Sequence, residues 1–156
     1  MQIGIISDTH GILKEEVLER LASCTAIFHA GDIGGSEILN KLKSLAPTYV
    51  VKGNNDSEEM NLQETLEVSL EDYKFYMIHD LNSLKTLPKG YDFVISGHSH
   101  QFNIHYKNKT TWINPGSCGK SRFGLPLTIV ILHIKEQVNI ELITLSKEKK
   151  ITKEKK

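Results

Sequence analysis

The stretch MQIGIISDTHG, at residues 1–11, predicts a buried strand that ends in a polar loop. Residues 1–7 are mostly apolar, and Asp8 opens the loop. The same pattern recurs twice, where residues 25–30 precede Gly31-Asp32 and residues 48–52 precede Gly53-Asn54-Asn55-Asp56. Three strands of this kind, each followed by Asp, His or Asn, form the framework of the expected fold.

Two amphipathic helices are expected between these strands, at residues 13–21 and 36–45. Their apolar residues recur at helical spacing, Ser36 is the expected N-cap of the second helix, and Pro47 follows its end. A strand–helix–strand–helix–strand order predicts a parallel sheet with right-handed crossovers. Since open α/β proteins bind ligands at the carboxyl ends of such strands, the three polar clusters are expected to meet at one edge of the sheet.

The rest of the chain is richer in strands than in helices. Only residues 81–87 are predicted as a helix there, whereas the predicted strands are 65–70, 73–79, 93–96, 102–106, 110–113, 127–134 and 138–145. The last two strands are expected to form a closing hairpin. Residues 147–156 contain six lysines and two glutamates without an apolar period, so we expect one domain over residues 1–146 and a disordered tail.

Composition limits the function classes that fit the chain. A length of 156 residues suits one domain, and a formal net charge of zero gives no overall attraction to nucleic acid or membranes. Cys24 and Cys118 are far apart, which gives no sign of a disulfide framework and fits a reducing cytosol. No segment approaches the roughly 20 apolar residues of a membrane helix, and the N-terminus lacks the basic region of a signal peptide. We therefore expect a cytoplasmic protein.

Seven side chains of metal-binding type lie at strand ends or follow glycine: Asp8, His10, Asp32, Asn54, His79, His98 and His100. Divalent metals bind carboxylate, imidazole and amide oxygen, and two ions about 4 Å apart need a bridging carboxylate with ligands around both. The set is larger than one ion can use. The sequence therefore predicts a centre for two divalent ions.

Five short blocks occur in order along the chain: Asp8-Thr9-His10, Gly31-Asp32, Gly53-Asn54-Asn55-Asp56, His79 and Gly97-His98-Ser99-His100. In this order they resemble the calcineurin-like metallophosphoesterase superfamily. Residues 114–117, Asn-Pro-Gly-Ser, are similar to a block of its YfcE-type phosphodiesterase branch. The resemblance implies a four-layer α/β/β/α sandwich with its site at the strand ends. It also implies a metal-dependent phosphodiesterase acting on a small phosphodiester substrate.

The resemblance further implies a role for each ligand. It assigns one ion to Asp8, His10, Asp32 and His100, and the other to Asp32, Asn54, His79 and His98, with Asp32 as the bridge. A hydroxide bridging the two ions is the expected nucleophile, and Asp32, Asn54 and Asn55 are the expected catalytic residues. Mn²⁺ is the expected metal because it suits oxygen and nitrogen ligands, and Zn²⁺, Fe²⁺ and Ni²⁺ would fit the same set.

Two residues depart from the superfamily's usual pattern. Many members carry a histidine at the position of Asn55, from which it can protonate the leaving oxygen, whereas an amide cannot deliver a proton. Asp80 follows His79 where relatives frequently have glycine, and we expect it to cap a helix that begins near Asn82. The candidates for substrate binding are Asn55, Ser117 and Arg122, although Arg122 and Lys120 fit a solvated surface pair equally well.

Two other functions fit the same sequence. A protein-binding scaffold with little activity has a precedent in a retromer subunit of this fold, and a phosphomonoesterase or nucleotide hydrolase would differ only in its substrate pocket. The complete ligand set favours an enzyme over a scaffold. A homo-oligomer and a contact between the lysine tail and nucleic acid are left open. His29, His105 and His133 lie outside the motifs and are expected to have structural roles.

Overall fold

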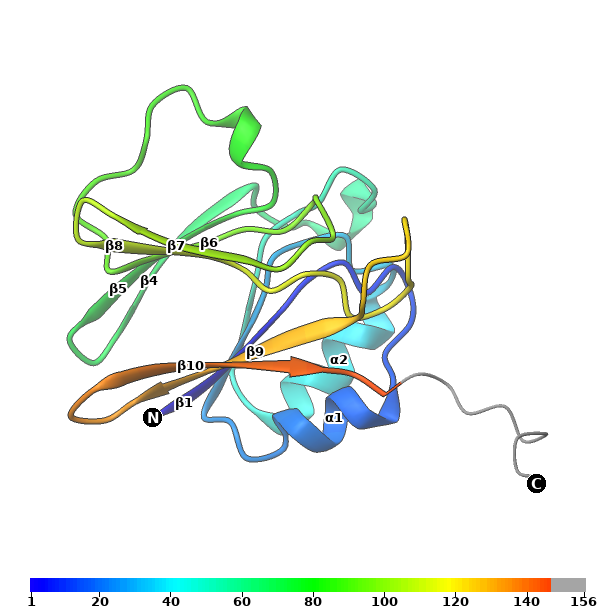
Figure 1. Cartoon of the computed structure of the whole chain (residues 1–156). Coiled ribbons are helices and arrows are strands. Elements are labelled where there is room, and N and C mark those ends of the chain that lie inside the picture. The colour runs from blue at the N-terminus through cyan, green and yellow to red at the C-terminus, as the bar shows by residue number, and fades with distance from the viewer. Residues whose placement is uncertain (147–156) are drawn as a thin grey trace.

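Two five-stranded sheets stack face to face in the computed structural model, which describes residues 1–146 (Figure 1). Helices cover the outer face of one sheet, and long loops gather at one end of the strands. The predicted tail, residues 147–156, lies outside the described residues.

The first sheet contains β1 (Gln2–Ile6), β2 (Ala26–His29), β3 (Thr48–Val50), β9 (Thr128–Ile134) and β10 (Val138–Thr144). Its strand order is β10-β9-β1-β2-β3. The first three strands pair in parallel, which confirms the sheet predicted from the opening strand–helix pattern. The strands β9 and β10 form the predicted antiparallel hairpin, which pairs with β1.

The helices α1 (Glu15–Leu21) and α2 (Ser36–Leu45) cover the outer face of this sheet. Close packing of α1 depends on Gly4 in β1, where an added Cβ would lie 2.3 Å from Leu21 Cδ2. The prediction that Ser36 is the N-cap of α2 is wrong, because Ser36 is already helical and Gly35 is the cap residue. Gly35 has φ 138°, a conformation that suits glycine.

The second sheet contains β4 (Thr65–Leu70), β5 (Tyr73–Ile78), β6 (Phe93–Ile95), β7 (Asn103–Lys107) and β8 (Thr110–Asn114). Its strand order is β4-β5-β6-β8-β7, with β5, β6 and β8 parallel. The helix predicted at 81–87 is wrong beyond its first turn, since only the 3₁₀ turn η2 (Leu81–Ser83) forms. Asn82, Ser83 and Thr86 are poor helix formers, and Pro88 disfavours helical backbone at the residue before it.

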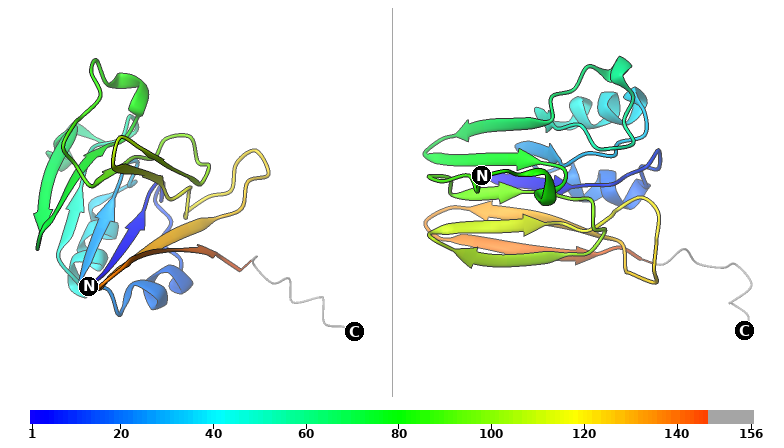
Figure 2. Two further views of the ribbon diagram at one scale, coloured as in Figure 1. Left: turned by 60° about the vertical axis from the view of Figure 1, so that its left-hand side comes forward. Right: turned by 90° about the horizontal axis from the view of Figure 1, so that it is seen from above.

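The layers follow the predicted α/β/β/α sandwich, with a reduced outer layer on one side. Figure 1 shows the two sheets one above the other, with α1 and α2 against the outer face of the first. Seen from above in the right panel of Figure 2, the strands of both sheets overlap and run in nearly the same direction. Beyond the second sheet, the outer layer is η2 and the segment that continues from it to β6. A further 3₁₀ turn, η1 (Glu58–Met60), follows β3. Within residues 1–146, no helix has the length and apolar character needed to cross a membrane.

The strands of the first sheet are apolar on both faces, because each face is covered. In β1, Ile3 and Ile5 pack against the second sheet, and Ile6 packs against the helices. Between the sheets, the ring of Phe75 meets that of Phe28 edge to face, with ring centroids 4.8 Å apart. Burying apolar surface on both sides contributes about 25 cal/mol per Å² and fixes the ends of these strands relative to one another.

Candidate metal centre

The loops that follow β1, β2, β3, β5 and β6 meet at one end of the sandwich, on the right in Figure 1. Backbone hydrogen bonds join these loops: Asp8 N–H donates to Gly31 O (3.0 Å), His10 N–H to Asp32 O (3.0 Å), and Gly97 N–H to His79 O (2.9 Å). Segments far apart in the sequence are therefore held in one cluster by the backbone itself.

Five of the seven predicted ligands have a left-handed backbone, with φ 57° at Asp8, 46° at His10, 60° at Asp32, 74° at His98 and 64° at His100. Asp, Asn and His adopt this conformation more readily than other non-glycine residues, but it still costs free energy. Such strain persists only where surrounding contacts enforce it, and it gathers at functional sites. Here it coincides with the ligand motifs.

The carboxylate of Asp8 is completely buried at the centre of the cluster. Its Oδ2 accepts hydrogen bonds from Ser7 Oγ (2.6 Å) and from His98 N–H (3.1 Å). Its Oδ1 has no hydrogen-bond partner among the described residues. Instead, Oδ1 faces the Nε2 atoms of His100 at 3.5 Å, His10 at 3.6 Å and His79 at 3.9 Å.

Asp32 lies between two of these imidazoles. Its Oδ2 is 3.3 Å from His79 Nε2 and 3.6 Å from His10 Nε2. Asn55 fixes the carboxylate, because its backbone N–H donates to Oδ1 (2.9 Å) and its side-chain Nδ2 donates to Oδ2 (3.1 Å). Burial alone would raise the pKa of Asp32, but the His79 imidazole and the Asn55 donors hold this pKa well below its usual range. Asp32 is therefore a persistent anion.

The tautomer of His79 follows from its surroundings. Nδ1 lies 2.7 Å from the carbonyl oxygen of Ala30, so Nδ1 carries the proton and donates it. Nε2 then faces the carboxylates of Asp8 and Asp32, and it has no hydrogen-bond partner in residues 1–146. A cation between these groups would take the place of a proton on Nε2. A backbone carbonyl that orients a histidine in this way is a usual feature of metal sites.

These atoms fit divalent cations. A buried polar atom without a partner costs about 1–3 kcal/mol, and a cation between Asp8 Oδ1 and the facing imidazole nitrogens would remove that cost. Two groups in the described chain bring their ligand atoms within 4.8 Å of one another: Asp8, His10 and His100, and Asp8, Asp32 and His79. Asp8 belongs to both groups, and Asp32 lies between His10 and His79, so two adjacent positions can be filled.

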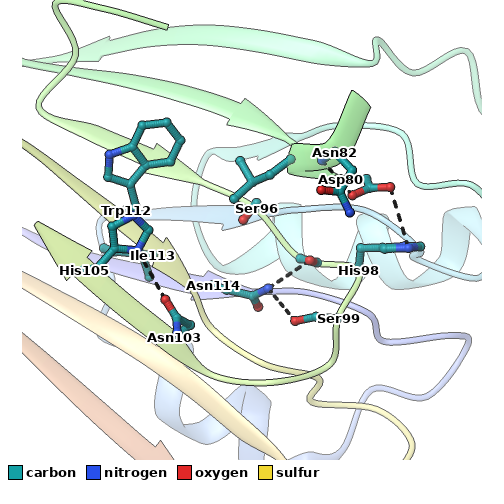
Figure 3. A pocket seen from close by; sticks show the side chains of 12 residues that line it. Asp80, Asn82, Ser96, His98, Ser99, Asn103, His105, Trp112, Ile113 and Asn114 are labelled. Carbon is teal, nitrogen blue, oxygen red and sulfur yellow. Dashed lines mark hydrogen bonds and ion pairs between the residues drawn. The ribbon is translucent and has the colours of Figure 1, made fainter. Parts of the chain in front are cut away.

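The two remaining predicted ligands lie at the open side of the cluster. Asn54 is exposed and lines a cavity of about 430 Å³ together with His79 and Asp80. His98 meets the ring of His79 edge on, with ring centroids 5.2 Å apart, and its Nε2 faces Asp80 Oδ2 at 3.7 Å. Figure 3 shows His98 and Asp80 in a neighbouring pocket of about 210 Å³. Asp80 also accepts a hydrogen bond from Asn82 N–H (3.0 Å), which confirms the predicted cap.

The candidates for substrate binding differ in position. Asn55 is exposed but bound to Asp32. Ser117 is buried, and its hydroxyl donates to the backbone oxygen of Asp8 (3.0 Å), which positions the first loop. Arg122 is exposed at the rim, and its charge acts on His100. The pKa of His100 is lowered mainly by burial, with the charges of His10 and Arg122 acting against that of Asp8.

Asp56 is a supporting residue whose role the sequence analysis did not assign. Its buried carboxylate accepts four backbone N–H groups, from Asp32 (2.9 Å), Ile33 (2.8 Å), Gly34 (3.3 Å) and Gly53 (2.8 Å). It therefore joins the loop after β2 to the loop after β3. The available signal was its place as the last residue of the Gly53-Asn54-Asn55-Asp56 block.

His29 has the structural role that was expected of it, and it supports two ligand loops. Its Nδ1 accepts a hydrogen bond from Gly31 N–H (3.1 Å), and its Nε2 lies 3.0 Å from Thr9 Oγ1. Burial, followed by the nearby charge of His79, lowers the pKa of His29 to about 3, so the ring is neutral. His105 stacks on Trp112, outside the metal cluster.

Comparison with known proteins agrees with a candidate metal site at these loops. The family model of the calcineurin-like phosphoesterase superfamily domain matches residues 1–137. A protein of Methanocaldococcus jannaschii named probable metallophosphoesterase MJ0623 is 35% identical, with 92% of this chain and 81% of that protein covered.

Two solved structures are also similar. One is a novel archaeal phosphodiesterase (27% identity, 93% and 100% covered, TM-score 0.76), and the other is the Escherichia coli phosphoesterase YfcE (25% identity, 85% and 88% covered, TM-score 0.71).

The fold alone is shared with a further protein. Vps29 of Entamoeba histolytica superimposes with a TM-score of 0.75 over 94% of this chain and all of that one, at 20% identity. The resemblance to phosphoesterases of the YfcE type and the predicted fold class are therefore both confirmed.

Proposed function

Since the chain belongs to the calcineurin-like phosphoesterase superfamily, we propose that it is a phosphodiesterase that uses two divalent metal ions. The observation that carries this proposal is the set of unpartnered, buried atoms at the strand ends. Asp8 Oδ1 and His79 Nε2 face each other and the other imidazoles without hydrogen bonds, which is the environment that a cation completes.

We assign the first ion to Asp8, His10, Asp32 and His100, and the second ion to Asp32, Asn54, His79 and His98. The position of Asp32 Oδ2 between His10 and His79 supports its role as the bridge. Divalent ions would acidify a water to supply the nucleophile at neutral pH and would offset the phosphate charge. Mn²⁺ is the proposed metal, because the set is made of carboxylate, imidazole and amide groups without thiolate.

The side chains of this protein hold that chemistry in place. Asn55 keeps the bridging carboxylate of Asp32 in a fixed orientation through two donated hydrogen bonds. The carbonyl oxygen of Ala30 accepts the Nδ1 proton of His79, which points Nε2 at the carboxylates of Asp8 and Asp32. Arg122 at the rim is suited to a charge-assisted hydrogen bond with a phosphate oxygen. The preorganised site therefore needs little rearrangement to bind ions.

A small phosphodiester is the proposed substrate, in keeping with the archaeal phosphodiesterase of similar structure. A phosphomonoesterase would use the same ions, so substrate preference has to be measured directly. A protein-binding scaffold of the same fold is the second candidate, because the chain shares its fold with Vps29. The buried, unpartnered ligand atoms favour the enzyme, because a scaffold gains nothing from leaving such atoms without partners.

The test compares hydrolysis of bis(4-nitrophenyl) phosphate and 4-nitrophenyl phosphate by metal-depleted protein before and after Mn²⁺ is added. We expect Mn²⁺ to restore activity, with the higher kcat/KM for the diester.

Asp32→Asn should lower kcat/KM by more than about 10²-fold, and by more than Asn54→Ala, because changes outside the ligand sphere already cost about 10–100-fold. Asp92→Asn, in a surface carboxylate that accepts Lys74 N–H, is the control. Near-normal turnover of Asp32→Asn at limiting Mn²⁺ would contradict the bridge.

A further inference from the structure

We propose that Asp80 is a positioning residue of the metal centre, and that its carboxylate orients His98 for the second ion. This inference rests on the proposed two-ion function. It assigns a role beyond the helix cap to a residue at a position where the family resemblance led us to expect glycine.

The two carboxylate oxygens of Asp80 have separate partners. Oδ1 accepts the hydrogen bond from Asn82 N–H (3.0 Å) and thereby caps η2. Oδ2 points the other way, toward His98 Nε2 at 3.7 Å (Figure 3). A cap needs only one oxygen, so Oδ2 can contact His98 while Oδ1 keeps the cap.

The backbone around Asp80 fixes this arrangement. The carbonyl oxygen of Asp80 accepts hydrogen bonds from Ser83 N–H (3.1 Å) and Ser83 Oγ (2.6 Å). On the other side, His98 has φ 74°, and its N–H is bonded to Asp8 Oδ2 (3.1 Å). The carboxylate and the imidazole are therefore held toward each other from two loops.

The contact between Asp80 and His98 determines which ring nitrogen of His98 can bind the second ion. A ring nitrogen next to a carboxylate carries the proton, so Nε2 becomes the donor and Nδ1 keeps the lone pair. Among residues 1–146, no hydrogen bond engages Nδ1 of His98. A histidine that binds a metal through one nitrogen commonly donates its other N–H to a carboxylate or a carbonyl.

The second ion would then have two imidazoles that are oriented in the same manner. Ala30 O accepts the Nδ1 proton of His79 at 2.7 Å, and Asp80 is placed to accept the Nε2 proton of His98. The present separation of 3.7 Å is an ion-pair distance and exceeds a hydrogen bond, so a small approach completes the contact. Asp80 also adds a negative charge beside an ion whose assigned ligands include one carboxylate, Asp32.

The test measures Mn²⁺ binding by calorimetric titration of the metal-depleted full chain. The variants are Asp80→Asn and Asp80→Ser, since both residues keep a side-chain oxygen that can cap η2 while removing the carboxylate. We expect affinity for the second ion to fall about 10–100-fold, with affinity for the first ion unchanged. Asp92→Asn is the matched control, because Asp92 also accepts a backbone N–H but lies in another loop.

A spectroscopic readout separates orientation of the ligand from a general loss of structure. At two equivalents of Mn²⁺, electron paramagnetic resonance should show coupled ions in the wild type and mostly single ions in both Asp80 variants. The metal-depleted proteins should have equal thermal unfolding temperatures. Two tightly bound ions in the variants, as in the wild type, would overturn the role of Asp80 alone. Equal weakening of both ions would also overturn it. Fewer than two ions in the wild type would overturn the proposed function itself.

Discussion

At the scale of single residues, Asn55 shows how one side chain limits the chemistry. Its backbone N–H and its side-chain amide donate hydrogen bonds to the two carboxylate oxygens of Asp32, so the residue orients the proposed bridge. An amide cannot protonate a leaving oxygen, and many superfamily members have histidine at this position. The rate should therefore fall steeply as the leaving alcohol becomes more basic.

Asn55→His tests this account. General acid catalysis is typically worth about 10²–10⁴-fold, and the gain should be largest for alkyl leaving groups and smallest for nitrophenolate. The measurement is the slope of log kcat/KM against leaving-group pKa, which we expect to become shallower in Asn55→His. Asn55→Ala is the control, because it removes the side-chain hydrogen bond to Asp32 Oδ2 without adding an imidazole. A shallow slope in the wild type would show that another group supplies the proton.

Side chains of metal-binding type could be recognised in the sequence, whereas contacts that depend on the fold could not. The Asp and His candidates could be selected because few other side chains bind metals, and five of the seven candidates lie in the two groups that could hold an ion. The bond from Asn55 to Asp32 could not be found, because it joins residues 23 positions apart whose approach depends on the fold. The buried acceptor role of Asp56 was missed for the same reason.

At the scale of elements, the ligand loops act as one unit because Asp56 ties two of them together. Four backbone N–H groups converge on its carboxylate, and charged hydrogen bonds of this kind are stronger than neutral ones. The loop after β2 carries Asp32, and the loop after β3 carries Asn54. A change at Asp56 should therefore affect metal binding without removing any ligand.

Asp56→Ala would leave four backbone donors without their acceptor. We expect the free energy of unfolding to fall by about 3 kcal/mol or more, since each buried unsatisfied donor costs about 1–3 kcal/mol. Asp56→Asn, which keeps one carbonyl acceptor, should fall between Asp56→Ala and the wild type. The measurement is urea unfolding of the metal-depleted proteins, with Asp92→Ala as the control for a half-buried carboxylate that also accepts a backbone N–H. A loss below 1 kcal/mol in Asp56→Ala would show that the loops hold without this residue.

The strands were predictable as elements because both sheets have strong apolar patterns, and most bounds agree within one or two residues. The predicted helix at 81–87 failed because its apolar spacing was not supported by good helix formers. Close approaches between elements were not predictable. At Gly97, for example, an added Cβ would lie 2.0 Å from Ser7 Oγ and 2.8 Å from Asp8 Oδ2, so the glycine lets the His98 loop reach the cluster.

At the scale of the whole molecule, the sandwich brings together candidate ligands that lie up to 92 positions apart, from Asp8 to His100. The first sheet supplies Asp8, His10, Asp32 and Asn54, and the second supplies His79, His98 and His100. The proposed ions therefore lie where the two sheets meet. Since cations would bind only the folded arrangement, Mn²⁺ should stabilise the protein as well as activate it.

The most direct measurement of the central claim is the rate of bis(4-nitrophenyl) phosphate hydrolysis as Mn²⁺ is titrated into the metal-depleted full chain. A two-ion phosphodiesterase should gain little activity with the first equivalent bound and most of it with the second, because the proposed bridge and both ligand groups are then complete. Full activity at one bound equivalent, or no activity with Mn²⁺ in excess, would contradict the account.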